Sequence, residues 1–401
     1  MTELTLLQQA FEQESRPNPY PIFAEMRKTP VAPQPDGTYV VSTYDEIVAL
    51  FHDPRISSDA ARHGQALGTP AFINTDPPVH DRLRRLATSH FGPPHRPDLV
   101  AELEPWLQET VDGLIDKLDG KGEIDVVDDF AYPFPVSAIC RILGVPREDE
   151  PKFHTWSENM IEALGARFSP GDHSEVFQRA LQAANQLGEY LGGLAEAHRK
   201  DPGDDIISGL VTDDGPDGRM DDEDVVATGR LLLIAGHETT VNLMANGMLT
   251  LLRHPEQLER LRKEPGYAIP MIEELLRFEP PVQVVPNRMA LADIDVGGTT
   301  IPKESHIVLV TASGNRDERR YADPDRFDPD RAEREHLSLG GGIHYCFGAP
   351  LARLEVQLAL RTLARRLENP RLLEDPPPYR PSPILRGPRH LRVQVDGIRP
   401  A

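Results

Sequence analysis

The sequence predicts a mainly α-helical protein with a small β-rich lobe. Helix signals dominate the chain from residue 18 to residue 277. One of these helices, expected at residues 222–253, would be about 48 Å long at roughly 1.5 Å per residue. Its apolar content indicates that it crosses the interior. Strand patterns are short and lie mainly in the last third of the chain, next to glycine pairs and prolines.

In chain order, the helices are placed by capping and helix-breaking residues. Thr43 to Glu46 has the capping-box pattern and opens a helix at 44–51. The other helices are expected at residues 18–28, 76–90, 99–117, 131–144, 151–165, 222–253 and 270–277, and one more begins at Ala349. Residues 55–74 have no clean period and are expected to form a long loop, either a functional lid or disorder. Residues 166–173 separate two helices, as a movable flap or as an ordinary connector.

The expected strands are few and short. They lie at residues 37–42, 294–296, 306–310 and 391–395. Because Gly297-Gly298 follows the second of them, residues 294–296 and 306–310 are predicted to form a small sheet together.

Composition excludes several classes of function. The 401 residues include 43 basic and 64 acidic ones, so the net charge is −21. Such a balance argues against nucleic acid and anionic membranes as partners. Two cysteines cannot build a disulfide framework, which fits a reducing cytosol. No apolar run is long enough to span a membrane, and the first residues do not resemble a secretory signal, so a cytoplasmic protein is expected.

The chemistry is concentrated around Cys346, which lies between a glycine-rich loop and the first turn of a helix. Gly340, Gly342 and Gly348 let the backbone turn and let a bulky group approach the sulfur. A sulfur at a helix N-terminus faces free N–H groups, which favour thiolate over thiol. A large metal macrocycle needs this combination. Alternatively, Cys346 is one more small buried hydrophobe, as Cys140 is expected to be within its amphipathic helix.

Two further patterns break the local rules of helices. The long helix contains Ala235-Gly-His-Glu-Thr-Thr240 inside an apolar run, where glycine lowers helix stability and a buried Glu–Thr pair costs desolvation. Such violations mark functional sites, although a polar seam facing neighbouring loops would look the same. His80 and Arg84 share one helix face, as a ligand-binding pair or as part of a solvated basic face.

Together these motifs resemble the cytochrome P-450 family of haem-thiolate monooxygenases. Residues 340–353 match its haem-ligand loop at Gly340, Gly342, His344, Cys346, Gly348, Leu351, Ala352 and Arg353. Leu339 departs, since the family usually has phenylalanine seven residues before the cysteine. Ala235–Thr239 matches the oxygen-activation motif of the family. His80 with Arg84, Glu274 with Arg277, and Arg288 match three more family motifs.

The resemblance implies one prism-shaped domain over residues 1–401, with haem b between the long helix at 222–253 and the Cys346 loop. Cys346 would be the iron ligand, and Gly348 would allow the macrocycle to approach. His80, Arg84, Arg288 and His344 would pair with the haem propionates. Thr239 would hydrogen-bond bound oxygen, Glu238 would relay protons to it, and Gly236 would leave room for it. Glu274, Arg277 and Arg326 would form a buried structural triad.

The implied reaction is the hydroxylation, or another oxidation, of an organic substrate with O₂. Electrons would come from a separate ferredoxin and its NAD(P)H-dependent reductase, with Arg82, Arg85 and Arg353 receiving the ferredoxin. The expected substrate is a neutral hydrophobic molecule, such as a steroid, terpenoid or macrolide-like natural product. Its pocket residues would be Leu232, Ala235, Val284, Val285, Ile384 and Leu385, with the loop that holds Leu67 and Phe72. A peroxide-dependent peroxygenase and a non-enzymatic haem sensor or carrier remain as alternatives, although neither uses a buried acid–alcohol pair.

Overall fold

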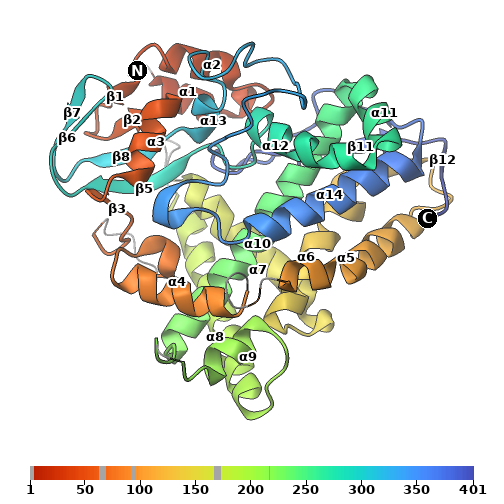
Figure 1. Ribbon diagram of the computed structural model, residues 1–401, viewed down its shortest axis with the longest axis horizontal. Coiled ribbons are helices and arrows are strands. Elements are labelled where there is room, and N and C mark those ends of the chain that lie inside the picture. The colour runs from red at the N-terminus through yellow and green to blue at the C-terminus, as the bar shows by residue number, and fades with distance from the viewer. Residues whose placement is uncertain (1–3, 63–68, 92–95, 97, 167–172, 216) are drawn as a thin grey trace.

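The computed structural model describes residues 4–62, 69–91, 96, 98–166, 173–215 and 217–401. Helices dominate it, and its outline is roughly triangular (Figure 1). The helices are α1 (Leu6–Phe11), α2 (Tyr20–Met26), α3 (Tyr44–His52), α4 (Val79–Ser89), α5 (Leu99–Asp116), α6 (Pro133–Leu143), α7 (Glu150–Ala166), α8 (Ser174–Lys200), α9 (Ile206–Thr212), α10 (Asp222–Arg253), α11 (Pro255–Lys263), α12 (Ala268–Phe278), α13 (Thr311–Gly314) and α14 (Ala349–Arg366). The predicted mainly α class, with a small β lobe, is confirmed.

Most of the strands gather at one corner, beside α2 and α3, whereas the last strands lie at the opposite corner, near α11 and the C-terminus (Figure 1). They are β1 (Val31–Pro33), β2 (Tyr39–Val41), β3 (Ile56–Ser57), β4 (Glu123–Asp125), β5 (Val285–Ala290), β6 (Ile294–Val296), β7 (Thr299–Ile301), β8 (His306–Leu309), β9 (Leu367–Glu368), β10 (Arg371–Leu372), β11 (Arg392–Gln394) and β12 (Gly397–Ile398). The largest sheet has the order β1-β2-β8-β5-β3, with β2 and β8 parallel and its other neighbours antiparallel.

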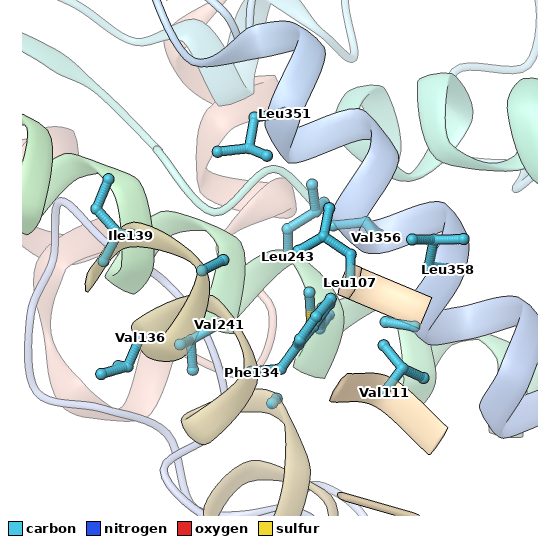
Figure 2. Close-up of a cluster of buried hydrophobic side chains, with 14 of the residues drawn as sticks. Leu107, Val111, Phe134, Val136, Ile139, Val241, Leu243, Leu351, Val356 and Leu358 are labelled. Atoms are coloured by element: carbon cyan, nitrogen blue, oxygen red, sulfur yellow. The ribbon is translucent and has the colours of Figure 1, made fainter. Parts of the chain in front are cut away.

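The core is built from helices that come from distant parts of the chain. Figure 2 shows Leu107 of α5, Phe134 of α6, Val241 of α10 and Val356 of α14 converging on one apolar cluster. Each of these side chains is fully buried. Burial of this kind stabilises a fold by about 1.5–3 kcal/mol for each large apolar side chain. The cluster therefore holds α10 and α14, the two helices that carry the candidate site, in a fixed relation.

The predicted bounds of the long helix hold, whereas the predicted partner of the strand at 294–296 and the predicted capping box at Thr43 were wrong. α10 spans the predicted residues 222–253. The strand at 294–296 pairs with β7 through the turn at Gly297 and Gly298, both at positive φ, and not with β8, which belongs to the large sheet. Thr43 precedes α3 but makes no capping bond to its backbone, because its hydroxyl is bonded to the Glu46 carboxylate instead.

The predicted structural triad exists with a different arginine. Arg277 donates two hydrogen bonds of 2.7 Å to the Glu274 carboxylate, and both side chains are buried. The third member is Arg331, whose Nε lies 3.4 Å from Glu274, and not Arg326, whose side chain is 68 % exposed. The loop turns the Arg326 side chain toward solvent while its carbonyl oxygen accepts from Arg277.

Two sequence predictions fall partly outside the described residues. The flap proposed at 166–173 includes residues 167–172, and Leu67 lies in the segment 63–68. Within the part of the chain that the structure describes, no helix is long and apolar enough to cross a membrane.

Candidate haem-binding site

The Cys346 loop is shaped by two glycines that no other residue could replace without strain. Gly340 and Gly342 have φ values of +70° and +60°, in the left-handed region. A Cβ on Gly342 would lie 2.1 Å from the carbonyl oxygen of Phe51 in α3. The loop closes through a 2.8 Å hydrogen bond from the Cys346 N–H to the carbonyl of Leu339. The sulfur is thereby fixed immediately before α14, which begins at Ala349.

The charge state of Cys346 depends on what binds it. The N–H groups of Gly348 and Ala349, together with Arg84 and Arg353, lower the pKa of the thiol, as the sequence predicts. Burial outweighs them, so the net effect in the metal-free protein is a raised pKa, and the expected preference for thiolate is not realised there. A metal ion reverses this balance, since it displaces the thiol proton when it coordinates sulfur.

Four cationic or imidazole side chains meet beside this loop. The rings of His80 from α4 and His344 lie 4.5 Å apart, centroid to centroid. Burial, followed by the positive charges of Arg288, His80 and Arg84, lowers the pKa of His344 to about 3. Burial likewise lowers the pKa of Arg288 to about 10.

Arg288 lacks the anion that normally accompanies a buried cation, whereas His80 Nδ1 lies 2.8 Å from the Asp81 carboxylate. Arg288 donates only to the carbonyls of Pro286 and Asn287, and it forms no ion pair with a described residue. Asp76 raises its pKa somewhat, but the Asp76 carboxylate is bonded to the Ser57 hydroxyl and the Ser58 N–H. We call His80, Arg84, Arg288 and His344 the cationic cradle.

A β-bulge aims Arg288 into the cradle. The register of β5 against β8 shifts between Val285 and Arg288, and Asn287 adopts φ +61° within the shift. Asparagine tolerates this left-handed conformation better than most residues. A bulge redirects the side chain that follows it, and Arg288, at the end of this shift, is buried close to His344.

The cradle fits the two carboxylates of a haem. His80 Nε2 and His344 Nδ1 are buried and have no hydrogen-bond partner among the described residues. Buried polar atoms of this kind normally have partners, so a polar ligand is expected here. A cavity of about 270 Å³ contains Cys346, Arg84, Arg288 and His344, and it adjoins a second of about 550 Å³ that shares Phe51, Arg288 and His344. The thiol, the glycine platform, the buried Arg288 and the unpaired imidazole nitrogens together match an iron macrocycle with propionate groups.

The opposite wall of the 270 Å³ cavity is α10. Ala235, Gly236, Thr239 and Thr240 line it, as do Leu231 and Leu232 one turn earlier. The Thr239 hydroxyl donates a 2.8 Å hydrogen bond to the carbonyl of Ala235. A Cβ on Gly236 would lie 2.9 Å from Ile139 of α6, so this glycine also permits close packing of two helices, beyond the role that the sequence suggests.

Glu238 lies behind this wall and is nearly fully buried. Its carboxylate is 3.4 Å from His237 Nε2 and 3.8 Å from Arg380 Nη1. Arg380 is also buried, and its guanidinium lies 4.0 Å from Glu158 of α7, a side chain that is 40 % exposed. A chain of ionisable groups thus leads from the surface to Glu238, which adjoins the cavity-lining Thr239.

Only half of the predicted pocket residues line this cavity. Leu232, Ala235 and Val285 do. Val284, Ile384 and Leu385 instead lie in a second core with residues of α1 and α2. Adjacent residues of an extended segment point to opposite sides, so Val284 and Val285 cannot both face the cavity.

Several residues that line the cavity were not predicted from the sequence. Val282, Ile139 and Ile142 line the cavity, and Phe72 does so as expected. Glu355 of α14 also lines it, fully buried, with no partner for either carboxylate oxygen among the described residues. Cys140 is buried in the core, as predicted, and burial raises the pKa of its thiol to about 12.

Comparison with known proteins agrees with this geometry. The family model described as Cytochrome P450 matches residues 3–395. The chain is 34% identical to 6-deoxyerythronolide B hydroxylase of Saccharopolyspora erythraea, covering 94% of this chain and 96% of the relative. It is 38% identical to vitamin D(3) 25-hydroxylase of Pseudonocardia autotrophica, covering 92% of each chain.

The fold agrees as well. The ligand-free crystal structure of CYP164A2 from Mycobacterium smegmatis superposes with a TM-score of 0.90 at 40% identity, over 97% of this chain and 99% of that one. The Cys346 loop, three members of the cradle (Arg84, Arg288 and His344) and the polar interruption of α10 line one cavity of this fold. The chain belongs to the cytochrome P450 family, whose members bind haem iron through a cysteine thiolate.

Proposed function

We propose that this monooxygenase binds haem b and inserts one oxygen atom of O₂ into a predominantly hydrophobic small molecule. Its electrons come from a separate ferredoxin and an NAD(P)H-dependent reductase. The observation that carries the proposal is the cavity that joins three features: the Cys346 sulfur, the cradle side chains of Arg84, Arg288 and His344, and an apolar wall interrupted by Thr239. The names of two relatives, a hydroxylase of 6-deoxyerythronolide B and one of vitamin D(3), support a large apolar substrate.

The haem supplies redox chemistry that no protein side chain can provide, and the thiolate of Cys346 tunes it. The protein's own contribution is to hold the cofactor, exclude bulk water and deliver protons. His80, Arg84, Arg288 and His344 hold the propionates through charge-assisted hydrogen bonds.

Proton delivery is assigned to the chain of groups behind α10. The half-exposed carboxylate of Glu158 exchanges protons with solvent. Arg380 contacts both Glu158 and Glu238, and so holds the Glu238 carboxylate close to Glu158. Glu238 passes protons to the Thr239 hydroxyl at the cavity surface. The hydroxyl rotates away from the Ala235 carbonyl, its partner in this structure, to hydrogen-bond a group in the cavity.

The substrate site is formed by Leu231, Leu232, Val282, Val285, Ile139 and Phe72. An apolar lining gains roughly 25 cal/mol per Å² of apolar surface buried, so it selects by shape and size. The proposal therefore favours substrates such as steroids, terpenoids or macrolide-like natural products.

The predicted ferredoxin contact needs revision at its arginines. Arg85 pairs with Asp217, Arg353 pairs with Glu273, and Arg82 lies 3.7 Å from Asp224. Because these charges are compensated within the chain, they attract an acidic partner less strongly than the sequence suggests. Ile343 and Tyr345 of the haem-ligand loop are 48 % and 41 % exposed, and we include them in the proposed contact.

The deciding experiment compares two oxidant systems on the haem-loaded protein. Turnover with O₂, ferredoxin and reductase, but little with hydrogen peroxide alone, supports the proposal. The reverse result identifies a peroxygenase, and no turnover of any substrate in either system favours a haem sensor or carrier.

A pair of threonine variants tests the proton route. Thr239→Ala should leave substrate binding intact and divert NAD(P)H consumption toward peroxide. Thr250→Ala is the matched control, since Thr250 makes the same bond to the carbonyl four residues earlier in the same helix, within the buried core. Unchanged coupling in Thr239→Ala would remove Thr239 from the route.

A further inference from the structure

His237 has no role in the proposed proton route, although it stands between Gly236 and Glu238 in the polar interruption of α10. Its imidazole is 1 % exposed. The Tyr132 ring packs edge-on against it, with the ring centroids 5.8 Å apart. Burying an imidazole costs desolvation unless its nitrogens find hydrogen-bond partners, so the partners of the two nitrogens indicate what the side chain does.

The first nitrogen of the His237 ring is committed to the backbone. Nδ1 lies 3.0 Å from the carbonyl oxygen of Leu233, one helical turn earlier. A carbonyl oxygen only accepts hydrogen bonds, so Nδ1 carries a proton in this arrangement. Nε2 is therefore the nitrogen that gains or loses a proton. A neutral ring has a lone pair there, and an imidazolium has an N–H.

Nε2 faces two oxygen atoms. The hydroxyl oxygen of Ser157 in α7 lies 3.3 Å from it, and a carboxylate oxygen of Glu238 lies 3.4 Å from it. The Ser157 hydroxyl donates its hydrogen to the carbonyl of Phe153 at 2.6 Å, so it turns a lone pair toward Nε2. An ionised carboxylate also offers only lone pairs. A neutral His237 beside an ionised Glu238 would therefore bring lone pairs against one another in a buried site, which is unfavourable.

One proton between His237 and Glu238 removes this conflict. An imidazolium donates from Nε2 toward both oxygens, and a protonated Glu238 beside a neutral ring donates to Nε2. Charged groups from other elements adjoin the pair: Arg380 Nη1 lies 3.8 Å from the second carboxylate oxygen of Glu238, and Glu158 of α7 lies 4.0 Å from Arg380. Two ionisable groups in such contact titrate together, so the proton belongs to the pair and not to either residue.

We propose that His237 and Glu238 hold one proton jointly, and that His237 is the positioning residue that keeps this proton available to Glu238. The inference rests on the proposed function and extends its proton route by one residue. The shared proton passes through the Glu238 carboxylate to the Thr239 oxygen, while the Thr239 hydroxyl releases its own proton into the cavity. The pair is left as a neutral imidazole and a carboxylate, and a proton taken up from solvent at Glu158 restores it.

Spectroscopy measures the protonation of the pair directly, without turnover. The haem-loaded protein is labelled with ¹⁵N-histidine and studied at pH 7 in its diamagnetic ferrous–CO form. The nitrogen shifts of His237, assigned by their loss in His237→Gln, distinguish imidazolium from neutral imidazole. A carboxylic acid band in the infrared spectrum that is lost in Glu238→Gln reports a protonated Glu238. The two protonated fractions should add up to one proton, and a total of no proton or of two protons overturns the proposal.

Variants test the role of the pair in proton delivery. His237→Gln keeps an N–H donor near the position of Nε2 but cannot release a proton, so the product formed per NAD(P)H consumed should fall roughly severalfold, with substrate affinity unchanged. His254→Gln is the matched control and should keep the wild-type yield, because His254 makes the same ring contact with the carbonyl four residues earlier, at the end of α10. In a Glu238→Gln background, His237→Gln should cause no further loss, since His237 acts through Glu238.

Each other result of the variants overturns the role of His237. An unchanged yield in His237→Gln, an equal fall in His254→Gln, or a further loss in the double variant would mean that His237 only packs between α7 and α10. Failure of the proposed function is distinguishable, because the protonation of the pair is measured without turnover. A protein that holds the shared proton but oxidises no substrate would contradict the oxidation and not the pair.

Discussion

Two groups of buried charges in this molecule are built in opposite ways. In the structural triad, the Glu274 carboxylate compensates Arg277 and Arg331, and the remaining guanidinium N–H groups donate to backbone carbonyls. In the cationic cradle, Arg288 has no carboxylate partner among the described residues, and the imidazoles of His80 and His344 keep unpaired nitrogens. Both regions bury cations, but only in the first does a buried carboxylate contact the arginines.

The difference distinguishes a structural site from a ligand site. Burying a charge without a partner costs several kcal/mol, so a fold retains such an arrangement only where something else supplies the missing charge. The triad finds its carboxylate and its carbonyl acceptors within the chain, and it stabilises the junction of α12 with the loop that follows α13. The cradle is complete only with an anionic ligand, and the nearby sulfur indicates which one.

The largest expected effect concerns that sulfur. Cys346→Ser should abolish the red-shifted absorption of the ferrous–CO complex, since serine does not replace thiolate as an iron ligand. Cys140→Ser is the control, because Cys140 is also buried but belongs to the core. If Cys140→Ser removes the absorption band and Cys346→Ser keeps it, the site has been assigned to the wrong cysteine.

The next effect separates the two charge groups by stability. Glu274→Ala leaves two buried arginines without their carboxylate and should lower the free energy of unfolding by about 3–5 kcal/mol. Glu335→Ala breaks the exposed ion pair with Arg320 and should change the free energy of unfolding little. Urea unfolding of both variants measures the difference. Similar losses would show that burial does not control the strength of these pairs.

Removing a charge from the cradle should have the opposite effect on stability. Arg288→Met removes an uncompensated buried charge, so the haem-free protein should be as stable as wild type or more so. Haem affinity should fall by about tenfold to a hundredfold, because a charge-assisted hydrogen bond to a propionate is lost. Haem transfer to an acceptor protein measures the affinity. A haem-free variant destabilised as strongly as Glu274→Ala would instead make Arg288 a structural residue.

Features that are formed by residues close together in the sequence could be predicted from it. The Cys346 loop, the span of α10 and the Glu238–Thr239 pair were all found because their residues are contiguous or a helical turn apart. Arg380 could not be found, since only the fold brings the segment before β11 to the back of α10. The path of one loop decides that Arg331, and not Arg326, joins Glu274 and Arg277 in the triad. The orientation of β5 decides that Val285, and not Val284, lines the cavity.

The smallest effect sharpens the comparison with a third buried group, Glu355. Unlike an arginine, a buried carboxyl group without a partner can avoid the cost of an unpaired charge by keeping its proton. Glu355 is fully buried, and burial raises its pKa well above the ordinary value. The carboxyl group therefore keeps its proton to a higher pH in the native state than in the unfolded chain, where a glutamate ionises near pH 4.3.

This difference makes the stability depend on pH with a definite sign. The native state binds one more proton than the unfolded state at any pH between the unfolded pKa and the higher native pKa. The contribution of Glu355 is thus fully present below about pH 4.3 and is lost as pH rises, by up to about 1.4 kcal/mol per pH unit.

Glu355→Gln mimics the protonated carboxyl, so it should flatten this decline of stability with pH. Wild type and variant should be equally stable near pH 4.5 and diverge at pH 8, with the variant the more stable, in urea unfolding of the haem-loaded proteins. Because the two proteins share every residue of the cradle and the Cys346 loop, the contribution of haem binding largely cancels in their difference. Parallel stability curves from pH 5 to pH 8 would mean that Glu355 is ionised and has a partner that appears only when haem is bound.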